Sequence, residues 1–177
     1  FTNNKYKNLK LNENPQPIID QREYKILPIK IDVAEKKSDR LVFFENELDF
    51  KSFHIDSYKK IYCVMLTNDE RQVKLGNKVL EYKKNLIKNQ IQNADLQIEF
   101  IKGNRFIELS SNEKDFDIIY PSVGENMSFL KRAMKKNNLT INYLIRDEDK
   151  YCWQFSNKGY FNFKSNIPKI LNQFELN

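Results

Sequence analysis

Residues 61–70 of this chain read IYCVMLTNDE, six apolar residues followed directly by a Thr-Asn-Asp-Glu sequence. A continuous apolar run of this length is typical of a strand that is buried on both faces of a sheet. Thr67 and Glu70 have the spacing of a capping box, in which the two side chains satisfy free backbone amides at the start of a helix. The stretch therefore predicts a buried strand and then a helix over about residues 68–92.

Short apolar or alternating runs on both sides of this unit predict further strands. In the first of them, Ile29, Ile31 and Val33 alternate with charged residues, and Pro28 restricts the strand to a sheet edge because proline lacks an amide donor. The other runs that favour strands are 41–44, 96–101, 105–109, 116–120, 139–145, 151–155 and 160–163. We therefore expect about eight strands.

Turn residues predict that several of these strands pair as hairpins. Gly103-Asn104 suits a type II′ turn between 96–101 and 105–109, and the four residues 156–159 would connect 151–155 to 160–163. Consecutive strands joined in this way are antiparallel. The expected sheet is therefore mixed but mainly antiparallel.

The remaining segments complete an α+β domain. Ser122 and Glu125 form a second capping box that opens a helix over about 123–136, and residues 167–174 suit a short C-terminal helix. Residues 1–23 are polar and contain Pro15 and Pro17, which is typical of a tail or linker. We expect one α+β domain over 24–177, and because the chain begins at Phe1 we interpret it as part of a longer or processed protein.

Composition excludes several kinds of site. The four glycines are isolated from one another, which argues against a Gly-rich loop for a phosphate or a dinucleotide. One histidine and two distant cysteines do not provide a zinc site or a disulfide framework. No apolar run approaches the roughly 20 residues that span a bilayer. Reduced cysteines suit the cytoplasm, and the extracytoplasmic part of an anchored protein is the alternative.

The basic charge is only partly informative. The formal net charge is +6, but Lys outnumbers Arg by 24 to 6, and abundant Lys, Asn and Ile are typical of an AT-rich genome. Residues 121–177 hold nine basic residues against five acidic ones. This local excess is compatible with a polyanionic partner.

The predicted C-terminal hairpin supplies the leading functional hypothesis. One of its faces would combine aromatic rings with lysines, the composition of a surface on which unpaired bases stack. The leading hypothesis is a non-enzymatic binding or assembly domain whose partner is single-stranded nucleic acid or another protein. The candidate binding residues are Tyr151, Trp153, Tyr160, Lys150, Lys158, Lys164, Lys131, Arg132 and Lys135.

Carboxylates after two predicted strands supply an enzymatic alternative. Glu45 follows the strand at 41–44, and Asp147 and Asp149 follow the strand at 139–145. Together these residues would hold Mg²⁺ for phosphoryl transfer, as in a nuclease. The leading hypothesis requires no cofactor and no metal. A third reading is a soluble domain of a membrane-anchored assembly, with residues 1–23 as the tether.

Overall fold

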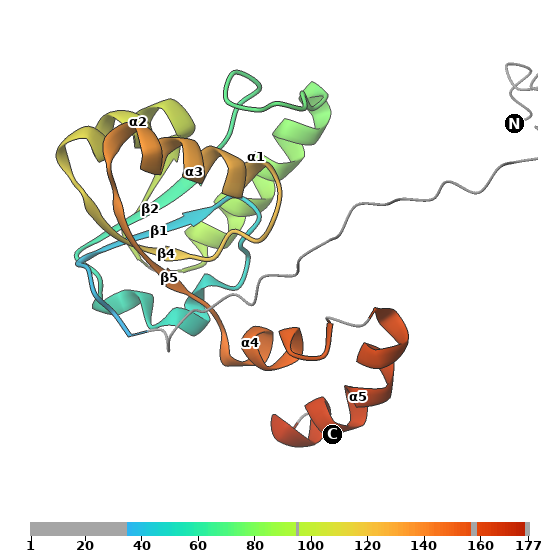
Figure 1. Cartoon of the computed structure of the whole chain (residues 1–177). Helices are drawn as coiled ribbons and strands as arrows, with labels where there is room; N and C mark the ends of the chain where they lie inside the picture. The colour runs from blue at the N-terminus through green and yellow to red at the C-terminus, as the bar shows by residue number, and fades with distance from the viewer. Residues whose placement is uncertain (1–34, 95, 157–158, 176–177) are drawn as a thin grey trace, which may run out of the picture.

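Five parallel strands form a single sheet in the computed structural model, which describes residues 35–94, 96–156 and 159–175 (Figure 1). Their order across the sheet is β3-β2-β1-β4-β5. The strands are β1 (Arg40–Phe44), β2 (Lys60–Met65), β3 (Ile98–Lys102), β4 (Asp115–Ile119) and β5 (Thr140–Leu144). Each neighbouring pair is parallel, with Leu41 opposite Ile61 on one side of β1 and opposite Asp117 on the other.

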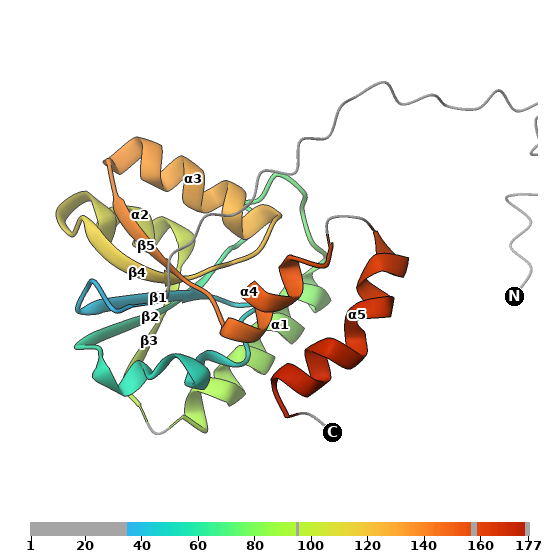
Figure 2. The same ribbon diagram turned by 60° about the horizontal axis from the view of Figure 1, so that its bottom comes forward.

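Helices cover both faces of this sheet (Figures 1 and 2). The helices α2 (Gly103–Asn112) and α3 (Glu125–Asn137) lie on one face. The helix α1 (Asn77–Gln92) and two short 3-10 helices, η2 (Phe50–Phe53) and η3 (Ile55–Ser57), lie on the other. The helix α4 (Asp147–Trp153) follows β5, and α5 (Tyr160–Gln173) packs on α4. The architecture is a doubly wound α/β sheet.

Alternation along the central strand explains the two cores. Val42 and Phe44 point toward α2 and α3, while Leu41 and Phe43 point toward α1, η2 and η3. The ring of Phe43 stacks on Phe50 of η2 with 4.7 Å between centroids. A strand that is apolar on both faces is the pattern expected of a parallel sheet that is covered on both sides.

The predicted fold class is wrong. The expected α+β sheet of about eight mainly antiparallel strands is a sheet of five parallel strands. The predicted strands at 41–44, 61–66, 96–101, 116–120 and 139–145 correspond to the five observed strands. The predicted strand at 29–33 and the predicted tail at 1–23 lie outside the described residues.

The first predicted hairpin is a strand followed by a helix. Residues 105–109 belong to α2, which begins at Gly103. A Cβ atom at Gly103 would lie 3.0 Å from Leu66 Cδ2 and 3.1 Å from the side chain of Glu70. Gly103 therefore allows α2 to approach the end of β2 closely, and it forms no hairpin turn.

The second predicted hairpin is also helical. Tyr151 and Trp153 lie in α4, and Tyr160 opens α5. Short aromatic runs alternate as strands do, but here Tyr151 lies in α4 and Phe155 in the turn that follows it, with 5.4 Å between the centroids of the two rings. The expected aromatic face of a hairpin is therefore absent.

The two main predicted helices have different outcomes. The helix expected at 123–136 is α3 (Glu125–Asn137), but the capping box predicted for Ser122 and Glu125 is wrong, because the N-cap is Gly124 and no side-chain cap hydrogen bond forms there. The helix expected at 68–92 begins only at Asn77, because residues 67–76 form a loop. Only one half of the predicted capping box forms, and it forms within this loop: the Thr67 amide donates to Glu70 Oε2 at 2.7 Å, but the Thr67 hydroxyl pairs with the same carboxylate and not with the Glu70 amide. The short C-terminal helix is longer than expected, since α5 spans Tyr160–Gln173.

Candidate functional site

The carboxyl ends of β1 and β4 create the most distinctive site in the sheet. The chain leaves β1 toward β2 and leaves β4 toward β5, so the loops after these two neighbouring strands diverge. In open α/β sheets, such a switch point forms a crevice in which ligands bind. A pocket of about 410 Å³ lies at this place, lined by residues after β1, β4 and β5 and by residues of α4.

Aromatic side chains form one wall of this switch-point pocket. The ring of Trp153 in α4 meets the ring of Tyr120 edge to face, with 5.4 Å between centroids. Tyr120 follows β4, and both residues line the pocket together with Phe44 and Phe53. Burial raises the pKa of Tyr120, so its hydroxyl remains neutral at physiological pH. This wall suits an apolar or aromatic ligand body.

Arg146, at the N-cap of α4 and two residues after β5, organises the polar wall. Its Nε atom donates to Asp49 Oδ2 and its Nη1 atom to Asp149 Oδ2, each at 3.1 Å. Its Nη2 atom donates to Glu47 Oε1 and, at 3.0 Å, to the carbonyl oxygen of Asp49. Burial works to lower the pKa of Arg146, but Glu47 and Asp149 outweigh it and raise the pKa, so the guanidinium stays charged.

The carboxylates of this wall keep capacity for a ligand. Arg146 uses one side-chain oxygen of each of Glu47, Asp49 and Asp149. No hydrogen bond from the described residues reaches the other oxygen of any of the three. Three carboxylates and one guanidinium line the pocket, so its charge favours a positively charged group.

A second pocket lies on the other side of Arg146. Its volume is about 400 Å³, and it is lined by η2, η3 and the first turn of α4. Lys36, His54 and Tyr58 contribute to it, as do Asp147 and Glu148. Acidic and basic groups balance in this second pocket, which therefore lacks the negative character of the switch-point pocket.

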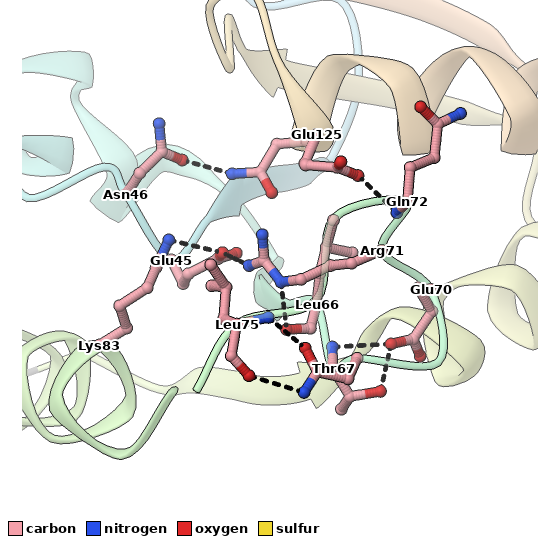
Figure 3. Close-up of polar contacts among 12 residues, drawn as sticks. Glu45, Asn46, Leu66, Thr67, Glu70, Arg71, Gln72, Leu75, Lys83 and Glu125 are labelled. Carbon is pink, nitrogen blue, oxygen red and sulfur yellow. Dashed lines mark hydrogen bonds and ion pairs between the residues drawn. The ribbon is translucent and has the colours of Figure 1, made fainter. Parts of the chain in front are cut away.

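A buried ion cluster lies next to the switch point, at the end of β1 (Figure 3). The carboxylate of Glu45 pairs with Arg71 and, at 3.0 Å, with Lys83 of α1. Its side chain has no exposed surface, and its second oxygen has no hydrogen-bond partner within the described residues. Arg71 belongs to the loop at 67–76, so the cluster attaches this loop to the sheet.

Two further carboxylates fix the same loop, and Figure 3 shows the contact of the first, Glu125, with Gln72. Glu125, at the start of α3, accepts hydrogen bonds from the backbone amides of Gln72 and Val73, both at 3.0 Å. Glu70 of the loop accepts from the amide of Asn104 in the first turn of α2 at 2.9 Å. The loop is therefore attached to α2 and α3, the two helices on one face of the sheet. Glu70 and Glu125 have a structural role in this attachment.

The three carboxylates predicted as a metal site are not brought together. Glu45 pairs with Arg71 and Lys83, Asp149 lines the switch-point pocket, and Asp147 lines the second pocket. Among residues 35–94, 96–156 and 159–175, no group of three His, Cys, Asp or Glu side chains is placed to hold a metal ion. The structure therefore offers no observation in support of the metal-dependent enzyme.

The predicted binding residues are spread over three helices. Trp153 lines the switch-point pocket, Tyr151 packs against Phe174 of α5, and Tyr160 is exposed at the start of α5. Lys158 lies outside the described residues. The others are Lys150 in α4, Lys164 in α5, and the exposed residues Lys131, Arg132 and Lys135 in α3, of which Arg132 donates to the carbonyl oxygen of Glu70 at 2.8 Å.

Sequence reasoning missed the residues that build the pocket walls. Glu47, Asp49, Tyr120 and Arg146 each follow a strand within a few residues. That position was the available signal, because the carboxyl ends of parallel strands share one edge of the sheet. A prediction of antiparallel strands places the carboxyl ends of neighbouring strands at opposite edges of the sheet. It therefore gives no reason to group these four residues in one site.

The chain matches no protein-family model, no curated protein and no solved structure. Within the part of the chain that the structure describes, no helix has both the length and the apolar character needed to cross a bilayer. The function therefore has to be argued from the site itself.

Proposed function

We propose that this chain is a binding domain that takes a small organic cation into the switch-point pocket. The observation that carries the proposal is the position and lining of this pocket of about 410 Å³ at the carboxyl ends of β1, β4 and β5. The volume lies within the usual range for small-molecule sites, roughly 300–1,000 Å³. The aromatic wall would contact the apolar part of the ligand, and the carboxylates would bind its charged group.

Electrostatics supports a cation over an anion as the ligand. An anion would face Glu47, Asp49 and Asp149, and the single nearby guanidinium already donates to all three. A cation would meet the carboxylate oxygens that Arg146 leaves free, and it would also gain from the faces of Tyr120 and Trp153. An amine attached to a flat ring is therefore a suitable first probe.

The test uses the fluorescence of Trp153, the only tryptophan of the chain. Benzylamine is titrated into the full chain at low salt, and benzyl alcohol serves as a neutral probe of the same size. We expect saturable binding of benzylamine and at least tenfold weaker binding of benzyl alcohol. Equal affinity for the two, or no saturable binding of benzylamine, would overturn the proposal.

Charge-removing variants locate the binding site. Asp49→Asn and Asp149→Asn should each weaken benzylamine binding about threefold, because each removes one partly exposed charge from the wall. Glu81→Gln removes the same charge from an exposed position of α1 that lines neither pocket, so its affinity should match the unmodified chain. A loss of equal size in Glu81→Gln would indicate a nonspecific effect of charge.

The proposal keeps the functional class that the sequence suggested, a binding domain. It replaces the expected nucleic acid or protein partner with a small organic cation. Contact with single-stranded nucleic acid was motivated by an aromatic hairpin, and its residues lie in α4 and α5. The other sequence-based expectations stay predictions. They are binding of nucleic acid, assembly with a protein partner, a cytoplasmic location, and membership of a membrane-anchored assembly. A polyanion would be detected in the same fluorescence assay with an oligonucleotide, whose binding falls steeply with salt.

A further inference from the structure

The polar wall of the switch-point pocket holds more negative charge than Arg146 balances. Glu47 and Asp49 follow β1, and Asp149 belongs to α4. A different nitrogen atom of Arg146 contacts each of them: Nη2 contacts Glu47, Nε contacts Asp49 and Nη1 contacts Asp149. Among the described residues that line the pocket, these four are the charged ones. Three negative charges and one positive charge give the wall a formal charge of −2.

The two aspartates lie on different sides of the guanidinium. A guanidinium is planar and its N–H donors form a fixed fork, so the N–H bonds of Nε and of Nη1 diverge by about 120°. Asp49 contacts Nε and Asp149 contacts Nη1, each at 3.1 Å. A single ammonium group beside Asp49 therefore leaves Asp149 with Arg146 as its only positive partner among the described residues.

We infer that the ligand of the switch-point pocket is a dication, with one positive group beside Asp49 and a second beside Asp149. This inference rests on the proposed function and narrows its ligand from a small organic cation to a diamine. Two ammonium groups balance the formal charge of −2, whereas one leaves the wall with excess negative charge. Both groups lie near Arg146, and the three surrounding carboxylates outweigh its repulsion.

The position of Asp149 supports a flat ring between the two ammonium groups. Asp149 and Trp153 are four positions apart in α4, so they share one face of this helix, and both line the pocket. A positive group beside Asp149 therefore also lies next to an indole ring, which attracts cations. The ring of Tyr120 continues this wall, with 5.4 Å between its centroid and that of Trp153.

The exposure of the aspartates sets the size of the expected effect. Their side chains are 67% and 48% exposed, and an ion pair at such a position strengthens binding by a factor of about two to five. The net charge of the whole chain is +6, which disfavours a dication in general. A preference for a dication therefore reports the charge of the pocket and not that of the whole protein.

The test compares two ligands of equal size in the full chain at pH 7 and low salt, with Trp153 fluorescence as the readout. The first ligand, 1,4-bis(aminomethyl)benzene, has two ammonium groups, and the second, 4-(hydroxymethyl)benzylamine, has a neutral hydroxymethyl group in place of one. We expect the diamine to bind about five times more tightly.

Variants locate the source of this preference. Asp49→Asn and Asp149→Asn should each reduce it to about twofold, the statistical advantage of a ligand with two equal ends. Glu81→Gln removes a charge from an exposed position that lines neither pocket, so it should keep the preference of the unmodified chain. Circular dichroism and thermal unfolding check that each variant is folded, and if one Asn variant does not fold, the other decides.

The outcomes separate this inference from the proposed function. A preference of twofold or less in the unmodified chain, or a fivefold preference retained in either folded Asn variant, would overturn the inference. The proposed function would survive both results, because amines would still bind. If neither of the two ligands nor benzylamine binds the unmodified chain, the proposed function itself is wrong. A fivefold preference that falls in the Asn variants and persists in Glu81→Gln supports the inference.

Discussion

Arg71 and Glu45 form a buried ion pair, in which Arg71 Nη2 lies 2.5 Å from Glu45 Oε1. The two side chains are 5% and 0% exposed, and they are 26 positions apart in the chain. Arg71 also donates to the carbonyl oxygen of Leu66 at 3.3 Å. The pair therefore joins the end of β1 to the loop at 67–76, which separates β2 from α1.

Removal of one member of this pair should be strongly destabilising. We expect Arg71→Met to lower the free energy of unfolding by about 3 kcal/mol, because among the described residues the buried carboxylate then has only Lys83 as a charged partner. The double variant Glu45→Leu/Arg71→Met should lose less than the sum of the two single variants, since it leaves no buried charge unpaired. Urea unfolding of the three variants measures this, and additive losses would contradict a coupled pair.

Acid should weaken the attachment of the loop at 67–76 to α3. The amides of Gln72 and Val73 donate to Glu125 and hold its pKa below the usual value of 4.5. Because the pKa is lowered in the folded state, this contact stabilises the fold above the unfolded pKa and is lost as pH falls through the folded pKa. Hydrogen exchange should show that these two amides are protected at pH 6 and lose protection only as pH falls below 4.5, the usual pKa of a glutamate.

The Glu125→Gln variant provides the comparison for the acid experiment. We expect weaker protection of Gln72 and Val73 at pH 6, because the uncharged amide oxygen is a poorer acceptor than a carboxylate. Glu108→Gln changes a carboxylate on α2 whose side-chain partner is Arg105, so the protection of the two loop amides should not change. Identical pH profiles for Glu125→Gln and the unmodified chain would show that Glu125 does not hold the loop.

Gly103→Ala should destabilise the protein although it adds a good helix former. Alanine in place of glycine inside a helix is worth about 1 kcal/mol. At this position, however, the added Cβ would lie 3.0 Å from Leu66 Cδ2, and the side chain of Leu66 is fully buried. We expect a net loss of about 1 kcal/mol in urea unfolding. A gain in stability would mean that Leu66 and Glu70 move apart at little cost.

The two cysteines should differ in their reaction with thiol reagents. Burial, with a contribution from Glu45, raises the pKa of Cys63, and this side chain has no exposed surface. The pKa of Cys152 is raised mainly by burial and also by Asp149 and Glu148, but Cys152 is only half-buried. A disulfide reagent at pH 8 should therefore modify Cys152 slowly and Cys63 only as fast as the protein unfolds.

Single variants assign the two phases of that reaction. Cys152→Ala should leave one phase whose rate follows global unfolding and increases with urea, whereas Cys63→Ala should leave the phase that is independent of urea. Modification of Cys63 faster than unfolding would show that the face of β2 beside α1 opens locally.

The positions of the observed strands were predictable, and their arrangement was not. Apolar runs such as 61–66 locate strands because a parallel sheet covered on both faces requires apolar side chains on both. The pairing of β1 with β4 depends on residues more than 70 positions apart, such as Leu41 and Asp117, and no local pattern encodes it. Short runs such as 105–109 fit a strand and a helix equally well.

Only individual residues of the candidate site were predictable from the sequence, and their arrangement was not. Trp153 and Asp149 were selected from the sequence, but for a hairpin face and for a metal site. Arg146 and Asp49, which form a wall of the pocket together, are 97 positions apart. Nothing in their sequence neighbourhoods relates them. The carboxyl ends of β1 and β5 lie at the same edge only because both strands are parallel to β4, which lies between them.

The amino-acid sequence by itself determined where the five strands and α3 lie. Its composition also argued against a phosphate-binding glycine loop, a zinc site and a disulfide framework. These properties follow from composition and from local periodicity, which act over a few residues. The tertiary structure alone decided that the sheet is parallel, that Gly103 permits a close contact, and that Arg146 joins three carboxylates beside an aromatic wall. Those properties depend on contacts between distant segments, because packing selects among arrangements that local preferences leave equally possible.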